Sequence, residues 1–191
     1  MTAKTSKIKL TPEKIVQATL KLAGEQSWEH ISLYDIASDL DVSLSDIFDV
    51  VEDKQDILGF YGRHIDKQVL AQMGQFGDGD SKKDILFDVL MDRFEILNEN
   101  RAALLSILKS FKFDPKQALF SAPHLCKSIS WMCEAANVNT FGWRGAMKIT
   151  AITGIYLNAL RVWMRDETQD LSKTMAVLDK SLNQVTGYLK L

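Results

Sequence analysis

The sequence predicts an all-α protein in which a small helical head precedes a larger helical bundle. Only three of its 191 residues are prolines, so few positions forbid a helix. Apolar residues recur at intervals of three and four, and no stretch alternates as a half-buried strand would. Ser32, Ser43, Asp53 and Ser81 each stand three positions before an aspartate, the spacing with which side chains cap a helix N-terminus.

The first predicted helix starts at Thr11, because Thr suits the N-cap and Pro12 suits the first helical position. Gly24 and Ser27 mark its end. The apolar residues between these points share one helix face, as expected for a helix packed against a core. They are Ile15, Ala18, Leu22 and Ala23.

Three more capped helices follow, of which the last extends beyond the head. Their capping pairs are Ser32 with Asp35, Ser43 with Asp46, and Asp53 with Asp56. Asp41 occupies the tight turn between the first two, since aspartate tolerates the left-handed conformation. The last of the three helices carries an apolar stripe made of Ile57, Leu58, Tyr61, Ile65 and Val69. These elements place a three-helix helix-turn-helix head in residues 1–60 and a helical body in residues 61–191.

The body is expected to contain helices throughout. A glycine- and aspartate-rich stretch, Gly74–Asp80, is the best predicted linker in the chain, and Ser81 with Asp84 caps the helix that follows it. Later helices are expected over Arg101–Phe113, from Pro115, again from Pro123, over about Thr140–Met164, and over about Leu171–Leu189.

The head resembles the TetR family of transcriptional regulators over roughly residues 11–60. That family reads I-A-x-x-x-G-V-S-x-x-x-x-Y-x-x-F-x-x-K-x-x-L. In the same register this chain has Ile36, Ala37, Asp41, Val42, Ser43, Phe48, Val51, Lys54 and Ile57. The resemblance implies a DNA-binding helix-turn-helix, with Lys54 in the position that contacts phosphate. It also implies a body that binds a ligand and forms a homodimer.

The candidate DNA contacts are the lysines of the N-terminal arm and residues of the helix-turn-helix. They are Lys4, Lys7, Lys9, Ser32, Ser43, Ser45, Phe48 and Lys54. The charge pattern opposes this interpretation. Lys54 is the single Lys or Arg among many carboxylates in Glu29–Asp56, and the expected recognition helix, Ser43–Val51, has no basic residue. Because DNA affinity draws mainly on neutralised phosphates, an acidic head that docks a basic protein is an open alternative.

Large apolar side chains in the middle helices are candidates for a hydrophobic or lipid ligand site, or else for plain core. They are Phe87, Met91, Phe94, Phe111, Trp131, Met132, Met147 and Tyr156. An apolar seam in the last two helices is the candidate dimer interface, which would complete a four-helix bundle across a two-fold axis, unless it packs within the chain. Its residues are Trp163, Leu171, Met175, Leu178 and Leu182.

A second resemblance lies in the last two helices. The pattern W-x-x-D-x-x-x-D-L, from Trp163 to Leu171, is followed by T-M-A at Thr174. It is similar to the C-terminal region of the TetR-fold lipid-binding accessory proteins of ubiquinone biosynthesis. This resemblance implies an alternative function, lipid binding without DNA binding, linked to ubiquinone or isoprenoid lipid metabolism.

Several classes of protein are not expected. The N-terminal sequence lacks the apolar segment of a secretory signal, and no apolar run approaches the roughly 18 residues that span a bilayer. Cys126 and Cys133, on one helix, would be too far apart for a disulfide, which favours a reduced cytoplasmic protein with no integral membrane segment. The three histidines show no metal-ligand spacing, so neither metal, cofactor nor enzyme activity is expected. The leading interpretation is a homodimeric TetR-type regulator that binds a DNA operator and responds to a hydrophobic ligand.

Overall fold

The computed structural model describes residues 10–74, 81–111 and 115–189. Within these ranges the protein has helices and no strand, which confirms the predicted all-α class. The elements are α1 (Pro12–Glu25), the 3₁₀-helix η1 (Trp28–His30), α2 (Leu33–Asp39), α3 (Leu44–Phe48), α4 (Lys54–Gln72), α5 (Lys82–Glu99), α6 (Arg101–Ser110), α7 (Pro115–Ala135), α8 (Gly142–Trp163) and α9 (Ser172–Leu189).

The head consists of α1, η1, α2, α3 and the first turns of α4. Its three predicted capping pairs are present, whereas Thr11 precedes α1 without a side-chain capping bond. The Ser32 hydroxyl accepts a hydrogen bond from the Asp35 amide at 3.2 Å, while the Asp35 carboxylate accepts one from the Ser32 amide at 2.7 Å. Ser43 and Asp46 repeat this capping box at the start of α3. Asp41 has a φ of 53°, the left-handed conformation expected for the turn between α2 and α3.

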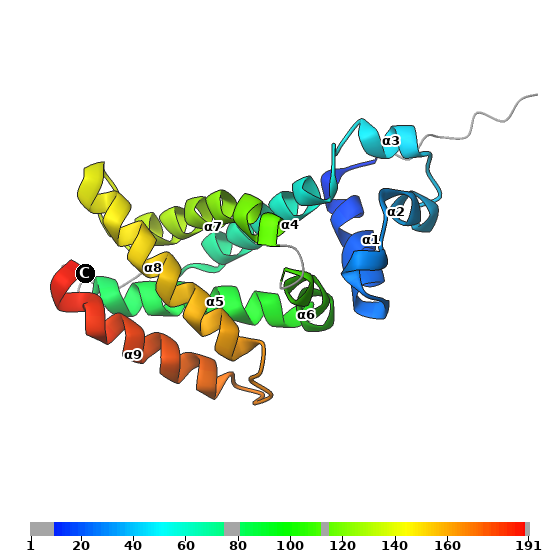
Figure 1. The fold of residues 1–191 in the computed structure, drawn as a ribbon. Coiled ribbons are helices and arrows are strands. Elements are labelled where there is room, and N and C mark those ends of the chain that lie inside the picture. The colour runs from blue at the N-terminus through cyan, green and yellow to red at the C-terminus, as the bar shows by residue number, and fades with distance from the viewer. Residues whose placement is uncertain (1–9, 75–80, 112–114, 190–191) are drawn as a thin grey trace, which may run out of the picture.

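Helix α4 belongs to both parts of the molecule. It packs against α1 in the head and against α5 and α7 in the body, and Figure 1 shows it running between the two. The expected boundary at residue 60 therefore falls inside one continuous helix. Most of the expected linker, residues 75–80, lies outside the described residues.

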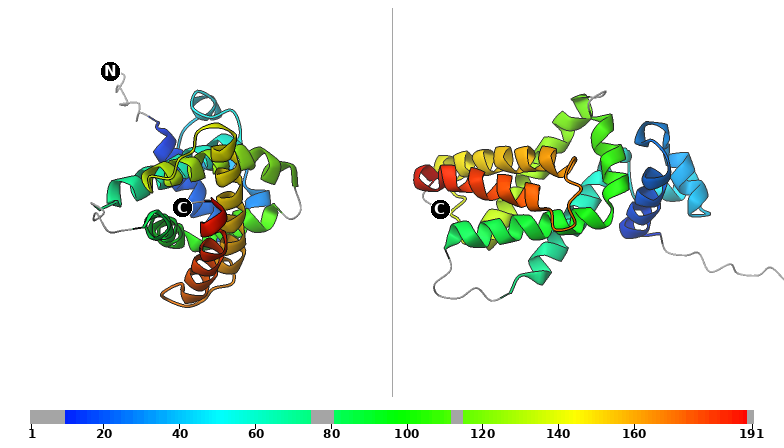
Figure 2. Two further views of the ribbon diagram at one scale, coloured as in Figure 1. Left: turned by 90° about the vertical axis from the view of Figure 1, so that its left-hand side faces the viewer. Right: turned by 90° about the horizontal axis from the view of Figure 1, so that it is seen from below.

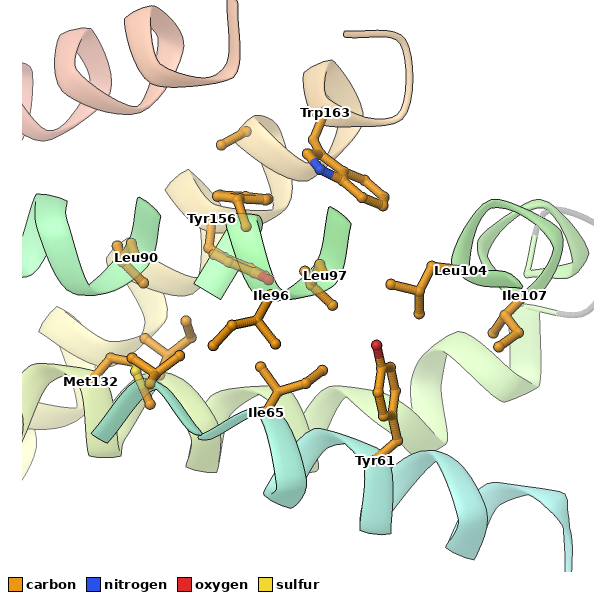
Figure 3. Packing of buried hydrophobic residues seen from close by; sticks show 14 of the residues in the cluster. Tyr61, Ile65, Leu90, Ile96, Leu97, Leu104, Ile107, Met132, Tyr156 and Trp163 are labelled. Carbon is orange, nitrogen blue, oxygen red and sulfur yellow. The ribbon is translucent and has the colours of Figure 1, made fainter. Parts of the chain in front are cut away.

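The body is a bundle in which α8 and α9 lie side by side, with α9 also packed against α5. Figures 1 and 2 show this pair at the opposite end of the molecule from α2 and α3. Buried side chains from the six helices α4 to α9 share the interior. Figure 3 shows Tyr61 and Ile65 from α4 facing Leu97 from α5, Leu104 from α6 and Tyr156 from α8.

Two predicted helix boundaries in the body are wrong. Pro123 does not start a new helix but lies inside α7. Proline in a helix interior removes one backbone hydrogen bond. Pro123 and Leu119, whose carbonyl loses its partner, are both exposed, so that carbonyl can be solvated. Helix α6 ends at Ser110 rather than Phe113, and residues 112–114 lie outside the described residues.

Candidate functional site

Two large apolar side chains lie on the exposed side of α3. Leu44 and Phe48 are 49% and 70% exposed, whereas Ile47 is fully buried and anchors the helix to the head. Since residues four apart share a helix face, Leu44 and Phe48 form one apolar surface, with Ser45 and Asp49 beside it. Figures 1 and 2 show α2 and α3 on the side of the head that faces away from α8 and α9.

The two capping serines are engaged in local hydrogen bonds. The Ser32 hydroxyl donates to Asp35 and the Ser43 hydroxyl donates to Asp46, both at 2.6 Å. The bonds from Ser32 hold the pKa of Asp35 below its ordinary value, so this carboxylate stays charged at neutral pH. Ser45, also a predicted DNA contact, is exposed beside Phe48.

Lys54 points into the head instead of out to solvent. Its Nζ donates to the backbone carbonyls of Trp28 and Ile31 at 2.8 and 2.6 Å, and lies 4.1 Å from the centre of the Trp28 ring. Burial lowers its pKa, although Asp35 and Glu29 lie close enough to oppose the shift. Lys54, which was predicted to contact phosphate, therefore links η1 to the start of α4 through these hydrogen bonds.

The remaining predicted DNA contacts, Lys4, Lys7 and Lys9, lie outside the described residues. The sequence interpretation missed Tyr34, which projects from the first turn of α2 and is 70% exposed. The sequence could have predicted its exposure, because Tyr34 follows the N-cap Ser32 by two positions and lies on the opposite side of α2 from the buried Ile36. Lys21 forms an ion pair with Asp39 at 2.5 Å, which ties one more cation to the acidic α2.

The predicted ligand residues divide between core and surface. Met91, Phe94, Met132 and Tyr156 are buried in the core, and the rings of Phe94 and Tyr156 stack with centroids 4.8 Å apart. Phe87 and Phe111 are partly buried. Trp131 and Met147 are 50% and 56% exposed, so these two residues do not line an interior with the other six.

A charged network that the sequence interpretation missed crosses the middle of the body. Asp66 of α4 pairs with Arg93 of α5, and both residues are at least nine-tenths buried. Ser128 of α7 donates to Asp66 at 2.5 Å, and Arg93 Nε donates to the Tyr156 hydroxyl of α8 at 3.1 Å. Burial raises the pKa of Tyr156. The network joins four helices and leaves neither ion of the pair without a partner, as a buried charge requires.

Four of the five predicted dimer residues are core residues. Trp163, Leu171, Leu178 and Leu182 are at most 3% exposed within the single chain, so their side chains have no surface left for a partner. The α9 seam packs on α8 and α5 because it supplies the inner face of the chain's own bundle. Met175, the fifth, is 41% exposed.

The exposed side of α8 carries a different stripe. Its residues recur at intervals of four and three and are all exposed: Trp143, Met147, Thr150, Gly154 and Leu157. Hereafter this set is called the α8 stripe. This spacing places all five residues on one helix face. Trp143, Met147 and Leu157 are large apolar residues, and Gly154 before Leu157 is small.

The residues of the second resemblance build the turn between α8 and α9. The Asp166 carboxylate accepts hydrogen bonds from the amides and hydroxyls of Thr168 and Thr174, at distances from 2.6 to 3.2 Å. Burial raises the pKa of Asp166, but these bonds outweigh it and hold the pKa well below its ordinary value. Arg101 of α6 donates to the carbonyls of Trp163 and Asp166 and lies over the Trp163 ring. The shared motif thus specifies how two helices join, and by itself carries no lipid-binding chemistry.

Two open hollows lie near the head. One of about 610 Å³ lies between the end of α1, η1 and α6, and one of about 250 Å³ lies between α1 and α2. None of the predicted ligand residues lines either of them. Ser106 bridges the floor of the larger hollow, since its hydroxyl accepts from the Trp28 amide and donates to the Gln26 carbonyl.

Among the described residues, no group of three or more His, Cys, Asp or Glu residues is arranged to hold a metal ion. No helix in the described ranges has the length and apolar character needed to cross a membrane.

Solved structures resemble this chain over nearly its whole length. The TetR transcriptional regulator from Nitrosomonas europaea ATCC 19718 is 24% identical, with a TM-score of 0.73 over 92% of this chain and 98% of that chain. A TetR transcriptional regulator from Rhodococcus sp. RHA1 is 13% identical, with a TM-score of 0.68 over 91% and 93%. A tetR-family regulator from Streptomyces coelicolor is 10% identical, with a TM-score of 0.58 over 93% and 84%. No protein-family model and no curated protein matches the sequence. The chain therefore has the fold of the TetR transcriptional regulators, as the sequence of its head predicted.

Proposed function

We propose that this protein is a homodimeric transcriptional regulator of TetR type that binds a DNA operator through its head. The observation that supports this most is the capped α2–α3 pair within a fold shared with TetR regulators along nearly the whole chain. Helix α3 presents Leu44, Ser45 and Phe48 outward, on the side away from the body, as a recognition helix must. A regulator of this kind acts in the cytoplasm.

Backbone contacts in this proposal come from residues other than Lys54. The exposed Tyr34 offers a phenolic hydroxyl from the first turn of α2, which suits a phosphate oxygen. The lysine arm, Lys4 to Lys9, directly precedes α1 in the sequence and carries positive charge. Asp49 opposes binding, because its exposed carboxylate shares the outer side of α3 with Ser45.

The proposed homodimer uses the α8 stripe and Met175 in place of the four buried seam residues. Two copies of α8 and α9 facing each other across a two-fold axis would form a four-helix bundle. A Cβ atom added to Gly154 would meet no other atom within 4 Å, so the partner helix has room to approach at this point. Such a dimer presents two heads to two half-sites about one helical turn of DNA apart.

The proposed regulator responds to a hydrophobic ligand only if its body opens. Because Met91, Phe94 and Met132 are buried in the closed core, a ligand would select a less populated, opened body instead of filling a ready cavity. Opening the body would disturb the Asp66–Arg93 pair and so move α4, the helix shared with the head.

The test of DNA binding measures fluorescence anisotropy of the full-length protein with genomic fragments, its own upstream region included. We expect one fragment to bind preferentially, and Asp49→Asn to strengthen that binding about threefold by removing one repulsive charge. Glu167→Gln, which removes an exposed carboxylate at the α8–α9 turn, is the matched control and should leave affinity unchanged. Failure to bind any fragment at low salt would refute the proposal.

The second candidate is a TetR-fold lipid-binding protein that does not bind DNA, linked to ubiquinone or isoprenoid lipid metabolism. It is favoured by the inward position of Lys54, which leaves the segment Glu29–Asp56 with no outward Lys or Arg side chain. Mass spectrometry of lipids that co-purify with the protein tests this candidate. A stoichiometric isoprenoid lipid, together with no DNA binding, would favour it over the regulator.

A further inference from the structure

We propose that the head reads DNA through the 5-methyl groups of thymine, with Phe48 and Leu44 as the reading side chains. This inference rests on the proposed DNA binding and adds the kind of sequence that is recognised. It follows from which chemical groups the outer face of α3 offers and which groups it lacks.

The outer face of α3 offers apolar contact. Phe48 and Leu44 are large, exposed and four residues apart, so they form one continuous apolar surface. Ile47 fixes the rotation of the helix, since it is fully buried and its backbone amide bonds back to the Ser43 carbonyl. Because Ile47 holds the helix in this orientation, Leu44 and Phe48 face solvent in the folded head.

The same face lacks the groups that read purines. Guanine and adenine are recognised by Arg, Lys, Asn or Gln, and α3 contains none of these residues. The Ser43 hydroxyl and the Asp46 carboxylate are bound to each other at 2.6 Å in the capping box. Ser45 can contact several bases without distinguishing them, and Asp49 can accept from the amino group of cytosine or of adenine.

Thymine is the one base that shows an apolar group in the major groove. An apolar recognition surface therefore gains most where thymine methyl groups line that groove, and it gains least over guanine–cytosine pairs. The carboxylates around α3 disfavour every DNA sequence alike, since phosphates are the same throughout, so they lower affinity without supplying specificity. Selectivity for thymine is left to Phe48 and Leu44.

The experiment starts with duplexes selected from a random pool by the full-length protein at low salt. Each thymine of the selected site is then replaced by deoxyuridine, which lacks only the methyl group. We expect the replacement of each contacted thymine to weaken binding about fourfold, the factor that corresponds to one buried methyl-sized group. Replacements outside the site should have no effect.

Variants assign the effect to residues. At the thymine that Phe48 contacts, Phe48→Ser should bind the thymine and deoxyuridine duplexes equally, because the contact with that methyl group is gone. Leu119→Ser removes a 72% exposed leucine on α7 and should keep the wild-type discrimination. Circular dichroism of both variants checks that the helical fold is retained.

The outcomes separate this inference from the proposed function. Selected duplexes that bind equally well with deoxyuridine overturn methyl reading and leave DNA binding standing. Recovery of no duplex overturns DNA binding and the inference with it. A loss of discrimination in Leu119→Ser equal to that in Phe48→Ser also overturns the assignment to α3.

Discussion

At the scale of single residues, Lys54 shows how a motif position can keep its residue type and change its partner. The TetR pattern places a lysine here, and the sequence predicted a phosphate contact from that pattern alone. In the structure the ammonium group instead joins two backbone carbonyls of the turn between α1 and α2. The lysine therefore stabilises the fold of the head.

Replacing Lys54 by methionine tests this role, because methionine keeps an apolar stem and removes the ammonium group. We expect the free energy of unfolding to fall by about 1–3 kcal/mol, since the Trp28 and Ile31 carbonyls lose a charged donor. Urea unfolding measures the change, with the exposed Lys173→Met as control. An unchanged unfolding free energy with weakened DNA binding would restore the phosphate role.

Asp166 gives a second prediction at this scale, on pH. Its folded pKa lies below the ordinary 3.8, so its stabilising contribution is complete above that pH and is lost as the pH falls below it. Asp166→Asn should lower the free energy of unfolding by about 2 kcal/mol at pH 7, since the amide cannot accept all four hydrogen bonds.

The difference between wild type and Asp166→Asn should shrink as the pH is lowered towards 3, because the wild-type carboxyl is then increasingly protonated in the unfolded chain. Urea unfolding over a pH series measures this. A difference independent of pH would show that the charge of Asp166 is not what stabilises the turn.

At the scale of helices, the local signals in the sequence were reliable where partners are close along the chain. The capping boxes of α2 and α3 join residues three apart, so nothing distant could override them. Helix ends without such a signal were less well predicted. Pro123 shows the limit, because whether proline breaks a helix depends on whether the freed carbonyl is buried or solvated.

Gly145 carries the prediction at this scale. A Cβ at this position would lie 2.0 Å from the backbone of Thr140. The first turn of α8 therefore has room only for glycine here. Gly145→Ala should destabilise the protein by about 1–3 kcal/mol, because the backbone must move. Gly62→Ala in α4, with open space around it, should instead be neutral or stabilising by up to about 1 kcal/mol. Thermal unfolding of the two variants measures the contrast, and equal effects would contradict it.

At the scale of the whole molecule, the proposed dimer depends on a surface that the single chain does not bury. The α8 stripe is the apolar surface of the bundle that the chain itself leaves uncovered on α8. Leu157→Asp places a charge in this stripe and should convert the dimer to monomer, since a buried unpaired charge is costly. Sedimentation velocity measures the change, with Leu119→Asp on α7 as control. A variant that stays dimeric would locate the interface elsewhere.

The sequence by itself determined the helices of this protein, their caps and the helix-turn-helix register, because all of these depend on residues within one or two turns of each other. The tertiary structure decided where side chains point. It turned Lys54 inward across 23 residues, paired Asp66 with Arg93 across 27, and buried Leu178 and Leu182 in the chain's own bundle. These outcomes depend on how helices distant in sequence pack together, and periodicity cannot distinguish a stripe that meets its own chain from one that meets a partner. The physical reason is that burial is a property of the assembled bundle, whereas helix formation is largely local.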